Sequence, residues 1–453
     1  MRLIVVANRP PIRKTESGWE PSVGGLATAL MPVLHEHGGV WVSMNEDPAA
    51  LPVQPFPEDD PRFEIRRVPL SEAEMADYYY GMANSVLWPI SHYMLQHVKL
   101  ERAFFRSYRE INARFAQTVL EAYRPGDYVW IQDYHLMLAP EYIRDAHPDA
   151  EIGFFWHIPW PAMEVFRILP GARDLLRGML ACDVIGFHVG EYVENFLKSV
   201  RVLLGAKVDD TSVIWGDRRV RVEAHPIGID VRRFEELSDD PATVQLADAL
   251  RDDVGTEYLL VGIDRLDYTK GILSRLLAFE QLLQERPQYR ERVTLYQIAT
   301  PSRTEVSSYR QLKREVDEAV GRINGAFARQ TWIPVRYVYR TYSQQELTVF
   351  YRAADVAMIT PLRDGMNLVT QEFIAASRKG VLLLSELTGA AYLMPEALHV
   401  NPYNVDDVVR GICDALEMSE AEKLERLHYL KQTVARLDVH QWAERFLAAM
   451  TAS

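Results

Sequence analysis

The sequence predicts an α/β protein made of two doubly wound domains, and three observations support this fold class. Short runs of β-branched and aromatic residues alternate with longer amphipathic segments along the whole chain. Several of these runs are apolar on both faces, as parallel strands between two layers of helices must be. The alternation restarts at Tyr258 after an interruption, which indicates a second domain of the same kind.

The apolar runs predict strands on both sides of this interruption. In chain order these strands span residues 2–7, 40–44, 128–132, 151–156, 183–188, 258–263, 293–299, 335–339, 356–359 and 380–384. Residues 212–215 and 219–224 are expected to form a hairpin at the end of the first half. The domain boundary is expected in the segment HPIGID, so the predicted domains are residues 1–229 and 230–437.

Amphipathic patterns predict helices between the strands, for example at 106–122, 191–204, 273–285 and 345–353. Two S-x-x-E sequences, Ser71 with Glu74 and Ser343 with Glu346, match a capping box and therefore predict helix starts. The last helical segment, 420–449, is long for one helix, so a break is expected near 437–440.

Composition excludes several classes of protein. In 453 residues, 48% hydrophobic and 25% charged residues are typical of a globular chain. The net charge of −13 argues against a nucleic-acid binder but allows phosphorylated ligands, provided that cations converge locally. The cysteines Cys182 and Cys413 do not make a disulfide framework. No signal-peptide pattern or membrane-length apolar run occurs, so we expect a cytoplasmic protein that does not bind a membrane.

Common catalytic signatures are missing from the sequence. It has no G-x-G-x-x-G after a strand, no Walker A sequence, no C-x-x-C, no H-E-x-x-H and no G-x-S-x-G. Dehydrogenases, P-loop enzymes, zinc enzymes and serine hydrolases therefore lack their usual markers here. We expect no metal site and no cofactor.

Polar and charged residues instead follow the predicted strands, where ligands of α/β sheets bind. Arg265 and Lys270 follow the strand 258–263 and could neutralise a diphosphate, although a solvated charged loop is the alternative. Asp364 follows the strand 356–359 at an expected helix N-terminus, and Glu372 lies about two turns later, a spacing that suits sugar hydroxyls. The alternative for Asp364 is a simple N-cap.

Further strand ends fit a polyhydroxylated ligand. Asp133 and His157 each end a strand, and the segment YYYGMANSVLWP supplies aromatic faces and phenol groups. After the first strand, Arg9 and then a Gly pair precede a helical pattern. Backbone amides there can hold an anion, although a simple turn is the alternative.

Taken in order, these segments closely resemble trehalose-6-phosphate synthases, which are retaining glucosyltransferases of the glycosyltransferase B type. The resemblance covers essentially the whole chain and rests on ANRPP, SVGGL, YYYGMANSVLWP, VWIQDYHL, GFFWHIPWP, HPIGID, RLDYTKG, IATPSR, GRINGAF, TPLRDGMNLV and VNPY. It implies two Rossmann-like domains that face a central cleft, with the C-terminal helix, about 438–453, packed back on the first domain. The implied reaction transfers glucose from a nucleotide diphosphate sugar, UDP-glucose or another, to glucose 6-phosphate.

The resemblance also implies roles for individual residues. Arg265 and Lys270 bind the donor diphosphate, Glu372 binds its ribose, and His157 contacts the transferred glucose. The whole donor-binding set is Gly25, Arg265, Lys270, Asp364, Gly365, Met366, Asn367, Leu368 and Glu372. The acceptor-binding set, of which Asp133 contacts hydroxyls and the others the phosphate, is Arg9, Tyr79, Trp88, Asp133 and Arg303. The catalytic set is Arg265, Lys270, Asp133, His157 and Asp364.

One position departs from the family pattern. The family usually has a second Trp after Trp41 in a W-x-x-W segment, and this chain has Met44 there, which has no indole N–H. Glucosylglycerol-phosphate synthases, which use glycerol 3-phosphate, are therefore the alternative, and a pseudo-glycosyltransferase that joins cyclitols is a third. A sensor that has lost turnover should lack the site residues, which are present. We also expect a separate trehalose-phosphate phosphatase downstream; a homo-oligomer is left open.

Overall fold

The structure is a computed structural model that describes residues 2–15, 18–21, 25–45, 50–57 and 59–452. Its contacts divide the chain into two compact units, which are called the first and second unit below. The first unit holds residues 1–227 and 439–453, and the second holds residues 228–438.

The first unit is built on a ten-stranded, mainly parallel sheet. Only the strands near its two edges, β5 and the β10–β11–β12 hairpins, include antiparallel pairs. In spatial order the strands are β10 (Lys207–Asp209), β11 (Ser212–Trp215), β12 (Arg218–Ala224), β9 (Val184–Phe187), β8 (Glu151–Phe155), β7 (Tyr128–Gln132), β1 (Leu3–Val6), β4 (Gly39–Met44), β6 (Phe63–Val68) and β5 (Val53–Phe56). A separate hairpin joins β2 (Ile12–Thr15) to β3 (Gly18–Pro21).

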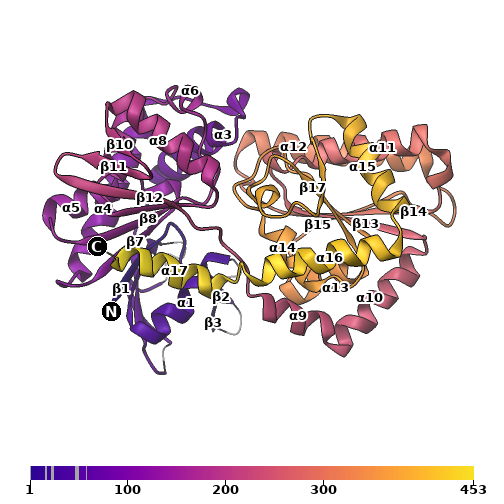
Figure 1. Cartoon of the computed structure of the whole chain (residues 1–453), viewed down its shortest axis with the longest axis horizontal. Coiled ribbons are helices and arrows are strands. Elements are labelled where there is room, and N and C mark those ends of the chain that lie inside the picture. Colours follow the sequence, from indigo (N-terminus) through magenta and orange to yellow (C-terminus); the bar gives the residue numbers. More distant parts are fainter. Residues whose placement is uncertain (1, 16–17, 22–24, 46–49, 58, 453) are drawn as a thin grey trace. The chain divides into compact units, whose positions relative to one another are not determined.

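Helices cover this sheet and join its strands (Figure 1). They are α1 (Gly25–His37), α2 (Glu72–Glu74), α3 (Trp88–Ser91), α4 (Arg102–Ala122), α5 (Ala139–Ala146), α6 (Met163–Phe166), α7 (Ala172–Met179), α8 (Gly190–Leu204) and α17 (Val439–Thr451). A π-helical segment, η1 (Met75–Leu87), runs between α2 and α3, and short 3₁₀ turns occur at η2 (Leu95–His97) and η3 (Tyr134–Leu136). The burial of β1 is complete, as its apolar sequence LIVV requires.

The second unit is built on a six-stranded sheet that is parallel throughout. In spatial order its strands are β15 (Val335–Tyr339), β14 (Val293–Thr300), β13 (Tyr258–Arg265), β16 (Val356–Ile359), β17 (Val381–Ser385) and β18 (Leu398–Val400). Helices lie on both faces of this sheet, as an all-parallel sheet requires.

One face of the second sheet carries α11 (Ile272–Glu285), α12 (Ser307–Phe327) and α15 (Val405–Glu417) (Figure 1). The other face carries α9 (Val231–Asp239), α10 (Pro241–Val254), α13 (Gln344–Ala353), α14 (Leu368–Ala376) and α16 (Glu420–Ala435). Three 3₁₀ turns, η4 (Tyr268–Lys270), η5 (Pro287–Tyr289) and η6 (Gly389–Tyr392), lie in the loops.

Both sheets have the strand order 3-2-1-4-5-6 of the doubly wound nucleotide-binding fold, if the central parallel strands are numbered within each unit. In the first unit β1 lies between β4 and β7, and in the second β13 lies between β14 and β16. In such sheets the connections leave in opposite directions at the point of reversal, which opens a crevice at the carboxyl ends of the two strands. The predicted fold class, α/β with two doubly wound sheets, is confirmed.

Most predicted elements exist, with ends within a few residues. Both capping boxes are formed, and the long C-terminal helix breaks between α16 and α17 as expected. The strands that the sequence analysis missed are β2, β3, β5, β6, β10 and β18. The miss at β6 has a clear cause, because its sequence FEIRRV includes Arg67, which is buried and donates to Gln54 (2.6 Å) and to the carbonyl of Leu51 (2.8 Å). A search for apolar runs treats an arginine as an exposed loop residue, so it misses a strand in which the arginine is buried.

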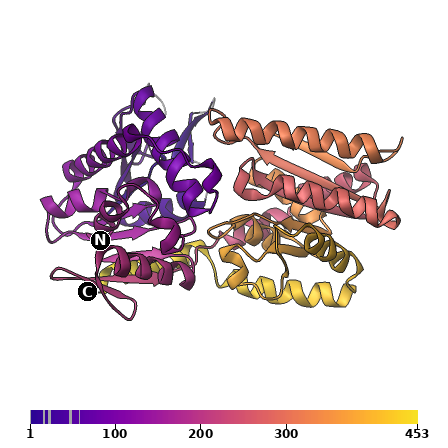
Figure 2. The same ribbon diagram turned by 90° about the horizontal axis from the view of Figure 1, so that it is seen from above.

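The C-terminal helix α17 packs on the sheet of the first unit, so both ends of the chain belong to that unit (Figures 1 and 2). The rings of Trp442 and Phe446 contact Trp130 of β7 and Phe155 of β8, with centroids 4.9–5.3 Å apart. This aromatic cluster anchors a segment that the sequence separates from its neighbours by about three hundred positions. In the described part of the chain, no helix combines the length and the apolar composition that crossing a bilayer requires.

Where the chain enters and leaves the second unit, two backbone segments touch at Gly228. A Cβ atom at this position would lie 0.9 Å from the carbonyl oxygen of Leu437, so no side chain fits there. We therefore expect Gly228→Ala to lower the free energy of unfolding by about 1–3 kcal/mol through overpacking, measured by urea denaturation. The control is Gly190→Ala at the start of α8, where a Cβ meets nothing within 4 Å and stability should not fall. Equal stability of the two variants would contradict this account.

Candidate active site

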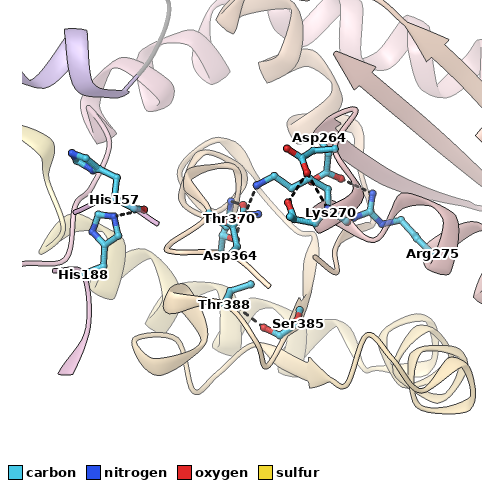
Figure 3. Close-up of polar contacts among 12 residues, drawn as sticks. His157, His188, Asp264, Lys270, Arg275, Asp364, Thr370, Ser385 and Thr388 are labelled. Atoms are coloured by element: carbon cyan, nitrogen blue, oxygen red, sulfur yellow. Dashed lines mark hydrogen bonds and ion pairs between the residues drawn. The ribbon is translucent and has the colours of Figure 1, made fainter. Parts of the chain in front are cut away.

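In the second unit, the loops that follow β13 and β16 meet at the point where the strand order reverses. Lys270, in the loop after β13, donates to Oδ2 of Asp364 in the loop after β16 (Figure 3). Nδ2 of Asn367 donates to the same oxygen at 3.0 Å. A cation and a carboxylate from two loops therefore face each other at the place where α/β sheets bind ligands.

Main-chain contacts hold these two loops together. The amide of Leu362 donates to the carbonyl of Thr269 at 2.7 Å. Gly271 has a φ of +65°, and a Cβ atom there would lie 2.4 Å from the carbonyl oxygen of Thr360. Only glycine permits this combination of conformation and close approach, so the loop RLDYTKG has its final glycine for a local structural reason.

The sequence analysis placed Asp364 and Gly365 at the N-terminus of the helix that follows, and this is corrected. The helix α14 begins at Leu368, and its N-cap is Asn367, whose side chain accepts from the amide of Thr370 at 3.3 Å. Asn367 has a φ of +76°, a conformation that asparagine tolerates better than most residues. Asp364 is therefore not an N-cap, and its carboxylate faces Lys270 instead.

Glu372, predicted from its spacing to Asp364, lies on α14. The hydroxyl of Tyr351 on α13 donates to Oε2 of Glu372 at 2.7 Å. Burial raises the pKa of Glu372. A carboxylate that is oriented by a phenol on a neighbouring helix can accept hydrogen bonds from a diol.

A fully buried ion pair lies beneath these loops. The guanidinium of Arg275 on α11 donates to Asp264 (2.7 Å) and Gln297 (3.0 Å), and its Nε donates to Thr360 (3.1 Å). The side chains of Arg275 and Asp264 are 0% and 2% exposed. The sequence analysis missed Arg275, because an arginine in a helix is normally exposed to solvent.

Replacement of Arg275 by Met should destabilise the second unit strongly. It leaves the carboxylate of Asp264 buried without its cation, which costs about 3–5 kcal/mol of unfolding free energy. Urea denaturation measures this loss. In the double variant with Asp264→Asn, we expect part of the stability to return, because no buried charge remains. A loss below about 1 kcal/mol in the single variant would contradict a structural ion pair.

Arg303, predicted to bind the acceptor, lies in the second unit, whereas Arg9, Tyr79 and Trp88 lie in the first. The side chain of Arg303 is 6% exposed, and its Nη1 donates to Oδ2 of Asp267 at 3.0 Å. Arg265, the last residue of β13, lies two positions before Asp267 and helps to lower the pKa of that carboxyl. The contacts of the second unit thus connect Arg303 to the loop that follows Arg265 and carries Lys270.

In the first unit, Arg9, Asp133 and His157 follow β1, β7 and β8, three neighbouring parallel strands. The guanidinium of Arg9 donates to the hydroxyl of Tyr79 at 2.9 Å, and the indole of Trp41 donates to the carbonyl of Arg9 at 3.0 Å. The point of reversal between β1 and β7 therefore carries a cation that two aromatic residues orient.

Asp133 has a strained backbone, with φ of 68° and ψ of 172°. This region is almost restricted to glycine and costs roughly 1–3 kcal/mol for other residues. Two hydrogen bonds to the next strand hold it: the amide of Asp133 donates to Phe155 (2.7 Å), and Oδ1 accepts from the amide of His157 (3.1 Å). Strain of this kind is concentrated at functional sites, which favours the predicted role of Asp133.

His157 sits between two polar neighbours. Its Nε2 lies 2.9 Å from Oε1 of Gln132, and Nε2 of His188 lies 3.1 Å from its carbonyl oxygen (Figure 3). Burial, together with His188, lowers the pKa of His157 well below its usual value of 6.5. The imidazole is therefore neutral at neutral pH, and when Nε2 donates to Gln132 its Nδ1 is an acceptor.

The lowered pKa of His157 predicts a pH-dependent contribution to stability. Below about pH 6.5 the unfolded chain binds a proton at this residue and the folded chain does not, so stability falls as pH falls. The loss is at most about 1.4 kcal/mol per pH unit and ends below the folded-state pKa. Thermal unfolding of the protein and of His157→Gln between pH 8 and 5 measures it. The two should converge as pH falls from 6.5, and parallel curves would contradict the assignment.

Tyr79 and Trp88 belong to one continuous segment of unusual geometry. Tyr79 lies within the 13-residue π-helical segment η1, and Trp88 begins α3 directly after it. Such segments are rare and often occur at functional sites. Tyr79 stacks on His135 with a centroid distance of 5.9 Å, and His135 contacts Tyr134, which in turn contacts Trp88. These rings connect Trp88 to the pair of Arg9 and Tyr79.

Met44, where the family pattern has Trp, is the last residue of β4. It is 2% exposed, and its amide donates to the carbonyl of Asn8 at 3.1 Å. The side chain fills the interior at this position and has no hydrogen-bond donor to offer. Gly25 is the first residue of α1, whereas the preceding Gly24, with Ser22 and Val23, lies outside the described residues.

The sequence analysis missed several residues that orient the predicted ones. Asp267 and Gln132 could have been found, because they lie inside the quoted segments RLDYTKG and VWIQDYHL, but His188, Tyr309 and Tyr351 carry no local signal. Among the described residues, no three His, Cys, Asp or Glu side chains converge in a way that could hold a metal ion.

Comparison with known proteins shows similarity along the full chain. The sequence profile of glycosyltransferase family 20 matches residues 1–452. A bifunctional trehalose-6-phosphate synthase/phosphatase from Thermoproteus tenax is 42% identical over 464 residues, which include 99% of this chain. This chain spans only 63% of the length of that relative.

Solved structures are similar over both units. One structure of a trehalose-6-phosphate synthase, from work on glycosyl transfer with retention and bisubstrate glycomimetics, has a TM-score of 0.92 at 32% identity and covers 100% of this chain and 99% of its own. A UDP-forming α,α-trehalose-phosphate synthase from Burkholderia xenovorans in complex with glucose-6-phosphate has a TM-score of 0.91 at 31% identity, with 100% of both chains covered. The predicted glycosyltransferase B fold is confirmed by these neighbours.

Proposed function

The chain belongs to glycosyltransferase family 20, and from this premise we propose that it transfers glucose from UDP-glucose to glucose 6-phosphate. The products are α,α-trehalose 6-phosphate and UDP. The observation that carries the proposal is the meeting of Asp364, at the reversal point of the second sheet, with Lys270 in the loop that follows Arg265 at the end of β13. A cationic pair beside a carboxylate suits a ligand that joins a diphosphate to a sugar. The likeness to a UDP-forming synthase with bound glucose-6-phosphate supports both substrates.

We propose that the second unit binds the donor. Arg265 and Lys270 are assigned to the diphosphate, Asp364 to the hydroxyls of the glucosyl group, and Glu372 to the ribose. The amides before and at the start of α14 supply further donors, as helix N-termini do for anions; they belong to Gly365, Met366, Asn367 and Leu368. Gly25, at the start of α1, is assigned to the donor on the family resemblance alone.

We propose that Arg9, Tyr79 and Trp88 bind the phosphate of the acceptor and that Asp133 binds its hydroxyls. The pairing of Arg9 with Tyr79 and the strain at Asp133 support these roles. The family resemblance assigns Arg303 of the second unit to the same phosphate. His157 is assigned to the transferred glucose, and its neutral imidazole suits a hydroxyl better than an anion.

In the proposed reaction, the bond between the anomeric carbon and the β-phosphate oxygen breaks, and a bond to the anomeric oxygen of the acceptor forms on the same face. The proton of that acceptor hydroxyl moves to the departing phosphate oxygen. Arg265 and Lys270 stabilise the negative charge that develops on this oxygen, and the remaining residues orient the two sugars. No side chain acts as a covalent nucleophile in this scheme.

The argument for glycerol 3-phosphate as the alternative acceptor was the presence of Met44 in place of the family's Trp. Burial of this side chain in the interior gives the substitution a packing role, and the bound glucose-6-phosphate of the Burkholderia xenovorans structure favours the hexose. We further propose that a separate phosphatase acts on the product and that the protein is cytoplasmic. The free cysteines Cys182 and Cys413 agree with a reducing compartment.

A donor-by-acceptor assay tests the proposal. UDP release should require both UDP-glucose and glucose 6-phosphate, and Arg265→Ala should lower kcat by about 10²–10³-fold, because it removes a group that stabilises the transition state. The variant should unfold at the temperature of the parent protein, since Arg265 ends a strand as an exposed residue. Release with glycerol 3-phosphate but not with glucose 6-phosphate would refute the proposed acceptor. A near-normal rate in Arg265→Ala would refute its role.

A further inference from the structure

Asp267 is a buried carboxylate that accepts four hydrogen bonds within the second unit. Its side chain is 0% exposed. Oδ1 accepts from the amide and the hydroxyl of Thr269, both at 3.0 Å. Oδ2 accepts from the hydroxyl of Tyr309 at 2.8 Å and from Nη1 of Arg303 at 3.0 Å. Both oxygens are thus fully used by groups from two separate parts of the chain.

The two oxygens serve different loops. The bonds from Thr269 shape η4, the turn that ends at Lys270 and follows Arg265, both of which are assigned to the donor. The bonds from Arg303 and Tyr309 come from the segment between β14 and α12, where Arg303 is assigned to the acceptor phosphate. One carboxylate therefore joins a loop of the donor subsite to a cation of the acceptor subsite.

Neighbouring cations keep the carboxyl of Asp267 ionised, and the backbone of Arg303 has an unfavourable conformation. Burial alone would raise the pKa of Asp267, but the charges of Arg303 and Arg265, the amide of Thr269 and the charge of Lys270 lower it to about 2. Arg303 has a φ of 44°, which is unfavourable for a residue with a side chain. Tyr309 donates to the same carboxylate, and burial raises the pKa of its hydroxyl well above 10, so it remains a donor.

We propose that Asp267 is a positioning residue that orients the donor loop and Arg303 together, so that the order of one subsite depends on the other. The inference rests on the proposed function, because it uses the assigned roles of Arg265, Lys270 and Arg303. Its physical basis is shared hydrogen bonding: a diphosphate that orders the loop around Thr269 also orders the carboxylate that holds Arg303. By linkage, each substrate then raises the affinity for the other by the same factor.

The test compares three variants by calorimetric UDP binding and by steady-state kinetics. Asp267→Asn removes the charge and a pair of acceptor sites. Tyr309→Phe removes one donor to Oδ2 and an acceptor for Nη1 of Arg303, and it leaves the bonds from Thr269 to Oδ1 in place. The matched control is Asp355→Asn. Asp355 lies at the opposite end of β13 and β16. Its side chain is 14% exposed, and it also accepts from a backbone amide, that of Leu259, and from the cation of Arg251.

We expect UDP to bind the parent protein at least 5-fold more tightly when glucose 6-phosphate is saturating. In Asp267→Asn this ratio should fall below 2, UDP affinity alone should fall by 10-fold or more, and the KM for glucose 6-phosphate should rise by a similar factor. Tyr309→Phe should raise that KM and leave UDP affinity alone within 2-fold. Asp355→Asn should lower the melting temperature and change neither ligand parameter in the folded protein.

Two results would overturn the inference. One is unchanged UDP affinity and an unchanged ratio in folded Asp267→Asn, which would make the residue a purely structural support. The other, decisive if Asp267→Asn does not fold, is a KM for glucose 6-phosphate in Tyr309→Phe equal to that of the parent. Failure of the proposed function is seen separately, as a parent protein that binds UDP but does not turn over with glucose 6-phosphate. UDP affinity in Asp267→Asn still tests the donor-loop role in that case.

Discussion

The guanidinium of Arg275, whose side chain is 0% exposed, connects three strands of the second sheet near their carboxyl ends. A charged group that is removed from water needs a counter-charge and hydrogen-bond acceptors. Arg275 finds them on Asp264 of β13, Gln297 of β14 and Thr360 after β16. Because these partners belong to different strands, the single side chain fixes the relative positions of the points from which the functional loops depart.

The loops that carry Lys270 and Asp364 follow two of the strands that Arg275 connects. Thr269 and Leu362 join the two loops through the main chain, and Lys270 faces Asp364 across them. The first unit has the same strand order but stabilises its loops differently. There, the hydroxyl of Tyr79 accepts from Arg9, and Oδ1 of the strained Asp133 accepts from the amide of His157. The same topology thus carries an ion pair between two loops in one unit and an arginine bonded to a phenol in the other.

The sequence predicted the parts of this architecture that depend on local pattern. Apolar runs identified the parallel strands of both sheets except β6 and β18, and the capping boxes at Ser71 and Ser343 marked two helix starts. Strands that violate the pattern were missed, such as β6 with its buried Arg67. The candidate site shows the same division. Residues at strand ends, such as Asp133 and Lys270, follow from position alone.

Residues that orient the site residues do not follow from position. Tyr351 acts on Glu372 from another helix, and Arg275 acts on three strands from a helix face. The erroneous N-terminus at Asp364 has a similar origin, because an aspartate and an asparagine three positions apart are both good caps, and sequence alone does not rank them. In the structure Asn367 is the cap, and the carboxylate of Asp364 is paired with Lys270, which lies 94 positions earlier in the sequence.

The pairing of cations with carboxylates changes the meaning of the net charge of −13. In the second unit, Lys270 is paired with Asp364 and Arg303 with Asp267, so neither cation offers an uncompensated charge to a ligand. A diphosphate must exchange with Asp364 to gain the full interaction with Lys270, and a carboxylate released in this way needs new donors. Sugar hydroxyls on the same ligand supply them. An anion such as sulfate has no hydroxyls with which to complete the exchange, so the ion pair favours a ligand in which phosphate and sugar are joined.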